Sequence, residues 1–256
     1  MLHDAKSFLA MIDPASPKYR SSRIYVAHGQ SWRITPRHAA GAAAVCWLGF
    51  AVTTALVLSG SSAPLDQAGL LFWRSGPLMM PRGPIWMLET VRDLTALGGV
   101  VLRYLFALAG FAALVFFRMR REAYVLAGTL LSGWLVESAV KLLVGRPRPL
   151  IVPQLTEAGG ASFPSGHSFN AALVYIALAL AFAALSPRPR LRWTLIAGAM
   201  VLSLGIALTR VWLGVHFPSD VIAGWCGGAA WAFTAAALLD RTATAAASRA
   251  GQELGV

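Results

Sequence analysis

A lysine, two arginines and a histidine gather around one Gly/Pro-rich stretch of an otherwise apolar sequence. Residues 141–149 read KLLVGRPRP, and residues 163–167 read FPSGH. Arginine matches phosphate oxygens bidentately, and lysine adds a point charge. Ser165 and Gly166 directly precede a long apolar run, so backbone N–H groups at the start of that helix could also bind phosphate. The stretch therefore indicates a site for an anionic group such as phosphate.

Two histidines and an aspartate could supply the chemistry at such a site. His216 and Asp220 are four residues apart, so the carboxylate can accept from one ring nitrogen and leave the other as a nucleophile or base. His167, at the start of an apolar run, could donate a proton to a leaving group. One histidine attacking phosphorus while another protonates the leaving oxygen would hydrolyse a phosphoester without a metal ion.

The composition indicates that lipid surrounds most of the chain. Hydrophobic residues make up 57% of the 256 residues and charged residues only 13%, with a mean hydropathy of +0.61, whereas soluble domains carry roughly 25% charged residues. The net charge of +11 does not indicate nucleic-acid binding, because Lys and Arg fall in short clusters between apolar runs. Cys46 and Cys226 each lie in an apolar run, so we interpret them as core residues and not as a disulfide or a metal site.

Six apolar runs predict an all-α, integral-membrane bundle of six transmembrane helices. A helical span needs about 20 apolar residues. We find neither an internal repeat nor a candidate soluble domain. The six predicted spans are residues 38–64, 96–117, 123–144, 168–185, 193–213 and 218–239.

The remaining segments complete the predicted domain organisation. Residues 1–37 are polar and basic and predict a cytoplasmic arm, residues 38–240 form the six-span domain, and residues 241–256 form a cytoplasmic tail. Residues 65–95 mix Gly, Pro, Trp and isolated charges, which predicts an external loop with one or two interfacial helices. The tryptophans of this loop suit the headgroup layer.

The distribution of Lys and Arg predicts the orientation in an inner (plasma) membrane. The N-terminal arm, the turns at 118–121 and 188–192, and the tail hold 14 of the 22 Lys and Arg residues, and six spans place all four segments on one side. Positive charge in connecting segments favours the cytoplasm, so both termini should be cytoplasmic. The extracytoplasmic face then receives Lys141, Arg146, Arg148, His167, Arg210, His216 and Asp220. Lys141, Arg148 and Arg210 are like charges that would repel one another unless an anion lies between them.

These residues form three pieces whose order and spacing resemble a known family signature. The pieces are Lys141 followed after six residues by Arg148-Pro149, then PSGH at 164–167, then Arg210 with His216 and Asp220 at fixed spacings. The pattern is similar to that of the type-2 phosphatidic acid phosphatase family, which shares it with vanadium haloperoxidases. The six-span layout covers roughly residues 38–240. One position departs, because Thr209 stands where the family usually has serine, although threonine keeps the hydroxyl.

The resemblance implies a role for each residue. It implies that His216 is the nucleophile that forms a phosphohistidine, that Asp220 orients it, and that His167 is the general acid. It implies no metal ion and no other cofactor. The residues that it implies for phosphate binding are Lys141, Arg148, Ser165, Gly166 and Arg210.

The resemblance also implies an integral-membrane phosphatase that hydrolyses a lipid phosphate or diphosphate ester. The lipid bilayer and its lipid phosphate would be its partners, with no nucleic acid and no obligate protein partner. Candidate substrates are phosphatidic acid, phosphatidylglycerophosphate, undecaprenyl diphosphate and lipid A phosphate, with undecaprenyl diphosphate the first expectation for a bacterial chain. Phosphotransfer from the phosphohistidine to an alcohol or lipid stays open, because it shares the first half-reaction. Haloperoxidase activity is disfavoured because those relatives are soluble, and a membrane anion transporter because the ionisable residues lie at span ends and not near the midplane.

Other residues near the signature receive structural interpretations. We interpret Arg146 as a surface or headgroup cation and Glu137 as the helix-face partner of Lys141. Arg103 is interpreted as an anchor whose long side chain reaches the membrane interface. Close helix packing in the last span is predicted from Gly224, Gly227 and Gly228.

Overall fold

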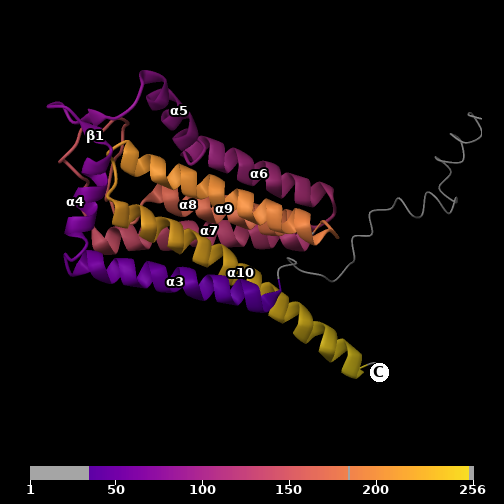
Figure 1. The fold of residues 1–256 in the computed structure, drawn as a ribbon. Coiled ribbons are helices and arrows are strands. Elements are labelled where there is room, and N and C mark those ends of the chain that lie inside the picture. The colour runs from indigo at the N-terminus through magenta and orange to yellow at the C-terminus, as the bar shows by residue number, and fades with distance from the viewer. Residues whose placement is uncertain (1–34, 184, 254–256) are drawn as a thin grey trace, which may run out of the picture. The chain divides into compact units, whose positions relative to one another are not determined.

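The computed structural model describes residues 35–183 and 185–253, the part from residue 240 onward by its backbone alone. The predicted cytoplasmic arm, residues 1–37, therefore lies almost entirely outside the described residues. The described chain consists of helices, one short hairpin and the loops that connect them (Figure 1). The helices are α3 (Pro36–Leu58), α4 (Ala63–Phe72), α5 (Ile85–Ala96), α6 (Val100–Phe116), α7 (Arg120–Val144), α8 (Gly166–Ala183), α9 (Pro189–Trp212) and α10 (Pro218–Glu253).

Five of these helices are long and apolar enough to cross a membrane, namely α3, α7, α8, α9 and the Pro218–Leu239 part of α10. Helices α5 and α6 pass the same test together, although they are bent by 45° at a short break. The predicted all-α bundle of six spans is thus confirmed when this bent pair is counted as one span.

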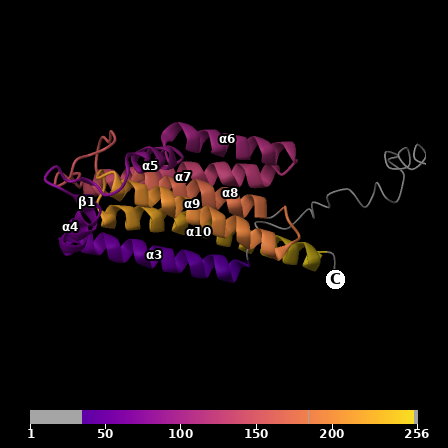
Figure 2. The same ribbon diagram turned by 45° about the horizontal axis from the view of Figure 1, so that its top comes forward.

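Helix α8 is the most enclosed of the candidate spans. It packs against α10, α9, α7 and α6, and α10 in turn packs along α3 (Figure 2). Within its 18-residue apolar window, 78% of the residues are buried, compared with 17% for α3. A helix that is apolar on all sides suits such a central position, and two of the predicted phosphate-binding residues, Ser165 and Gly166, lie at its start.

Glycines let α10 approach α8 closely. A Cβ atom at Gly224 would lie 2.6 Å from the backbone oxygen of Ser165, and one at Gly228 would overlap the carbonyl oxygen of Phe169. The predicted close packing is therefore confirmed. Its consequence is local: the Ser165 N–H donates to the Asp220 carbonyl oxygen at 3.0 Å, which joins the first turns of the two helices.

The segment between α3 and α6 lies at one end of the bundle (Figure 1). It holds the two helices α4 and α5, and between them the antiparallel strands β1 (Arg74–Ser75) and β2 (Met80–Pro81), which the sequence analysis did not predict. Arg74 donates to the Trp212 carbonyl oxygen at 2.8 Å, where a cation complements the C-terminal end of α9. The hairpin is thereby attached to the turn that carries His216.

The predicted start of the second span, residues 96–117, is wrong, because the helix is broken there. Helix α5 ends at Ala96 and α6 begins at Val100, so the straight part of this span is 17 residues, or about 26 Å long. A Cβ atom at Gly98 would lie 2.5 Å from Ile206 Cγ2 and 3.3 Å from His167 Cδ2. The break between α5 and α6 is therefore packed directly against the start of α8.

Candidate active site

His216 lies in the short turn between α9 and α10 and is only 2% exposed. Its Nε2 atom is 3.0 Å from Arg148 Nη1. A guanidinium can only donate, so this contact assigns the lone pair to Nε2 and the hydrogen to Nδ1. Burial, reinforced by the charge of Arg148 and opposed by Asp220, lowers the pKa of His216 from 6.5 to about 4. The ring is neutral near neutral pH, and the Nε2 lone pair, which accepts from Arg148 in this structure, is the one that can act as a nucleophile or base.

Ser162 lies between His216 and Asp220. Its hydroxyl donates to Asp220 Oδ2 at 2.5 Å and lies 3.3 Å from His216 Nδ1, whereas Nδ1 and Oδ2 are 3.6 Å apart. Asp220 Oδ2 also accepts from the Phe217 N–H at 2.9 Å. The carboxylate expected to orient the histidine is therefore close to it, but its shortest link to the ring runs through the serine hydroxyl.

Arg148 is held by three backbone carbonyl groups as well as by the histidine. It donates to Gly159 O at 2.7 Å, to Gly160 O at 3.1 Å and to Val215 O at 2.9 Å. Burial lowers the pKa of this guanidinium, although Asp220 opposes the shift. The contacts fix the guanidinium plane beside His216 Nε2, where one phosphate group could reach both residues.

Arg146 is not a surface or headgroup cation, so that interpretation is wrong. It donates to Asp220 Oδ1 at 2.6 Å and to Asp66 Oδ2 at 2.7 Å. Asp66, on α4, also accepts from Ser219 N and Ser219 Oγ at 2.9 and 2.7 Å. Asp66 and Asp220 are 1% and 0% exposed. One arginine thus compensates two buried carboxylates and connects α4 to the first turn of α10.

Lys141 is directed at the loop before α8. Its ammonium donates to Ala161 O at 3.2 Å and to Pro164 O at 2.9 Å, and it lies 3.4 Å from Glu137 Oε1. The predicted pairing with Glu137 on one helix face is confirmed. A Cβ atom at Gly166 would lie 2.9 Å from the same carboxylate oxygen, so the ion pair stands directly against the first turn of α8.

Arg210 and His167 complete the predicted set. Arg210 is 3% exposed and donates to Thr95 Oγ1, on α5, at 2.9 Å, while its Nε has no partner among the described residues. The charges of Arg210 and Arg148 both act on His167, which keeps some exposure. Thr209 instead donates back to Ile206 O within its own helix.

Ser165 is engaged away from this cluster. Its side chain is fully buried and accepts a hydrogen bond from Ser168 Oγ at 2.9 Å. Its backbone N–H donates to Asp220 O. At the start of α8 the N–H groups of Gly166 and His167 precede the first intrahelical bonds. These groups, more than the Ser165 hydroxyl, are placed to meet an anion.

Sequence reasoning missed Asp66, Ser162 and Ser219 and misassigned Arg146. The only signal for Asp66 was a carboxylate isolated in an apolar segment, which is rare without a charged partner. Ser162 precedes the PSGH piece by two residues, but nothing in its spacing indicates a contact with residues 216 and 220. These contacts join segments that are far apart in the sequence.

Comparisons with known proteins agree with this fold. The PAP2 superfamily model matches residues 121–243. Phosphatidylglycerophosphatase B of Bacillus subtilis is 34% identical over 150 residues, which are 56% of this chain and 70% of the relative. Lipid A 1-phosphatase of Rhizobium etli is 36% identical over 115 residues, 41% of this chain but only 45% of that enzyme.

A solved structure shows the fold. It is that of a transmembrane PAP2-type phosphatidylglycerolphosphate phosphatase from Bacillus subtilis, with a TM-score of 0.66 and 24% identity over 78% of this chain and 96% of the other. The chain is an integral-membrane phosphoric-ester hydrolase. It belongs to the PAP2 superfamily.

Proposed function

We propose that this protein hydrolyses a lipid phosphate or diphosphate ester through a phosphohistidine on His216. The bond between phosphorus and the lipid oxygen breaks as Nε2 attacks, and His167 gives its proton to the leaving oxygen. A water molecule then attacks the phosphohistidine, returns a proton to His167 and releases inorganic phosphate. Arg148, Arg210, Lys141 and the N–H groups at the start of α8 stabilise the phosphoryl oxygens.

The observation that carries this proposal is the setting of the His216 ring. Its Nε2 atom lies 3.0 Å from Arg148 Nη1. A phosphate group next to both residues would therefore contact a neutral nucleophile and a guanidinium that binds its oxygens. The other ring nitrogen faces Ser162 and Asp220, which hold the reactive tautomer. This arrangement suits attack on phosphorus and needs no group beyond the chain itself.

The substrate and the side of the membrane belong to the same proposal. The relatives are named for phosphatidylglycerophosphate and lipid A 1-phosphate, and we place the substrate of this chain among lipid phosphates and diphosphates, including phosphatidic acid and undecaprenyl diphosphate. The Lys and Arg distribution supports cytoplasmic termini and a site at the extracytoplasmic face.

The test is phosphate release by the protein purified in detergent with a chelator. We expect release from at least one lipid phosphate, and a loss of about 10⁴-fold or more in kcat for His216→Ala, as for other missing nucleophiles. A brief reaction with ³²P-labelled substrate, quenched in alkali, should leave label on the wild-type protein and none on this variant.

The matched control is His38→Ala, which removes an exposed histidine at the N-terminal end of α3. It should behave as wild type in both measurements. Retention of full activity by His216→Ala would rule out the proposed nucleophile, and the absence of phosphate release from every lipid tested would rule out the proposed function.

A further inference from the structure

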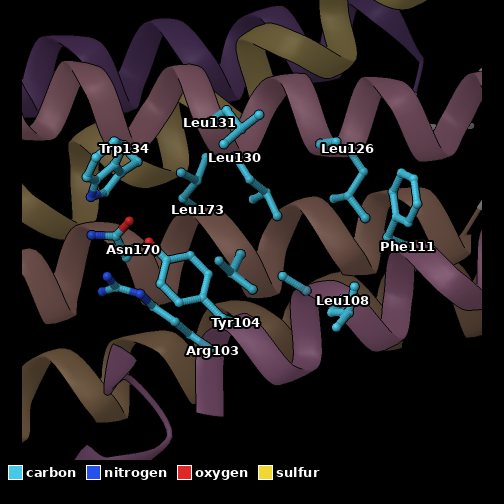
Figure 3. A pocket seen from close by; sticks show the side chains of 13 residues that line it. Arg103, Tyr104, Leu108, Phe111, Leu126, Leu130, Leu131, Trp134, Asn170 and Leu173 are labelled. Atoms are coloured by element: carbon cyan, nitrogen blue, oxygen red, sulfur yellow. The ribbon is translucent and has the colours of Figure 1, made fainter. Parts of the chain in front are cut away.

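A cavity of about 550 Å³ opens between α6, α7 and α8, outside the cluster around His216. Figure 3 shows its lining, which is apolar along most of its length. Leu108 and Leu131 on its rim are each 65% exposed, and in a membrane such side chains face lipid. The cavity therefore has the size and the surface of a site for a hydrocarbon chain that enters from the bilayer.

The cavity is polar at one end only. Arg103 and Asn170 line that end, where their side chains lie near each other (Figure 3). Arg103 is 8% exposed, and within the described part of the chain it forms neither a hydrogen bond nor an ion pair; its Nε is buried without an acceptor. The interpretation of Arg103 as an interfacial anchor is therefore wrong.

A buried cation without an anion is costly within a membrane. Arg103 has one favourable neighbour, the Tyr104 ring, whose centroid is 5.1 Å from its Cζ. A cation–π contact supplies part of the missing compensation but leaves the N–H donors of the guanidinium unused. A phosphate would use these donors bidentately.

The polar end of the cavity adjoins the proposed general acid. Asn170 is one turn beyond His167 on α8 and donates to Gly166 O at 3.0 Å. Gly98, at the break before α6, lies against the His167 ring, and the Arg103 charge acts on that ring. The leaving group of the reaction must lie on the side of His167, because His167 protonates it. The cavity therefore begins where the lipid part of the substrate departs.

We infer that the cavity binds the lipid chain of the substrate and that Arg103 binds a second phosphate located between the chain and the scissile phosphate. This inference rests on the proposed function and narrows its substrate class. Polyprenyl diphosphates carry such a group bonded directly to the scissile phosphate, and phosphatidylglycerophosphate carries it beyond a glycerol. Phosphatidic acid has no second phosphate.

The experiment compares Arg103→Gln with wild type on three substrates in one detergent: phosphatidic acid, phosphatidylglycerophosphate and a polyprenyl diphosphate. Loss of a charge-assisted interaction should lower kcat/KM about 10- to 100-fold for at least one of the two-phosphate substrates, mainly through KM. The loss on phosphatidic acid should be at least about tenfold smaller. Whichever two-phosphate substrate shows the loss identifies the spacing that Arg103 recognises. Equal losses on all three substrates would overturn the inference, since Arg103 would then act on the scissile phosphate or on the fold.

Two controls separate recognition from folding and from the proposed function. Arg190→Gln removes an exposed arginine at the first turn of α9 and should leave all three rates unchanged. Arg103→Lys keeps the charge without the bidentate geometry, so it should recover part of the discrimination if the first variant is poorly folded. Activity of wild type on phosphatidic acid alone would sustain the phosphatase proposal while overturning the role of Arg103.

A second variant tests the chain site independently. Leu130→Trp places a larger side chain in the cavity lining and should lower kcat/KM for a long-chain substrate more than for a short-chain analogue with the same headgroup. The same loss for both chain lengths would argue against occupation of the cavity by the chain.

Discussion

Arg146 and Arg148 are chemically identical side chains, two residues apart, in opposite surroundings. Arg146 lies against two buried carboxylates, while Arg148 lies against carbonyl groups and a histidine. Pro147 between them favours extended backbone at residue 146, and the segment follows the end of α7 at Val144. The first arginine therefore connects structural elements, and the second faces the proposed nucleophile.

The low pKa of His216 has a consequence for the pH dependence of the reaction. The ring loses its nucleophilic lone pair when it is protonated, which occurs below about pH 4 in the folded protein and near pH 6.5 for an ordinary histidine. We expect kcat/KM to decrease on the acid side with an apparent pKa near 4 that is due to the enzyme and not to the substrate. The measurement is a pH profile of kcat/KM, corrected for the ionisation of the substrate phosphate by ³¹P titration.

Arg148→Gln provides the control for the origin of this shift. Removing a positive charge that lowers the pKa should move the acid limb to higher pH, whatever the loss in absolute rate. An acid limb at pH 6.5 that does not move in the variant would contradict the assignment. Folding is linked in the same direction: the unfolded chain binds the proton near pH 6.5 and the folded chain only near pH 4, so this residue lowers the free energy of unfolding as the pH falls between these values.

At the scale of elements, the site depends on α4 and the hairpin as much as on the long spans. Asp66 on α4 reaches Arg146 and Ser219, and Arg74 on β1 reaches the end of α9. Thr95 on α5 accepts from Arg210. The segment predicted to be an external loop thus supports three residues of the candidate site or their direct neighbours.

Asp66→Ala should weaken both stability and activity. Arg146 keeps its ion pair with Asp220, but one of its N–H groups and both donors of Ser219 lose their acceptor, and each buried donor left unpaired costs about 1–3 kcal/mol of unfolding free energy. We expect a lower unfolding temperature in detergent and a lower kcat, because the contacts of Asp66 with Ser219 hold the first turn of α10, which carries Asp220.

The comparison variant is Asp93→Ala, which removes an exposed carboxylate on α5. It should change the unfolding temperature and kcat little, since exposed charges contribute at most about 1 kcal/mol. If Asp66→Ala changed the unfolding temperature and kcat as little as Asp93→Ala, the contact between α4 and α10 would not be needed for stability or activity.

For the molecule as a whole, the sequence predicts what depends on composition and short spacing. Apolar runs of about 20 residues locate the spans because lipid demands them, and the four-residue spacing of His216 and Asp220 brings them together. Contacts between distant segments, such as Ser162 with His216 or Asp66 with Arg146, produce no periodic pattern in the sequence and could not be predicted from it. The break at Gly98 was missed for a related reason: the apolar run continues through it, and only its packing on Ile206 and His167 requires the glycine.

The proposed orientation of the molecule can be tested by labelling. In a chain with Cys46 and Cys226 replaced by alanine, Glu157→Cys lies in an exposed position of the loop before α8, and Arg190→Cys lies exposed at the start of α9. A membrane-impermeant maleimide should label the first in intact cells and the second only after permeabilisation. The reverse pattern would place the site in the cytoplasm.

Arg146, shared between Asp66 and Asp220, also ties the site to the order of biosynthesis. During synthesis Asp66 is made first, Arg146 follows the third span, and Asp220 is made only at the start of the sixth span. Until the last helix enters the membrane, the arginine has one carboxylate, and the histidine that Asp220 and Ser162 hold has no fixed tautomer. A nascent chain that stalls before its final span lacks the aspartate that the proposed mechanism requires, so we expect activity only when insertion is complete.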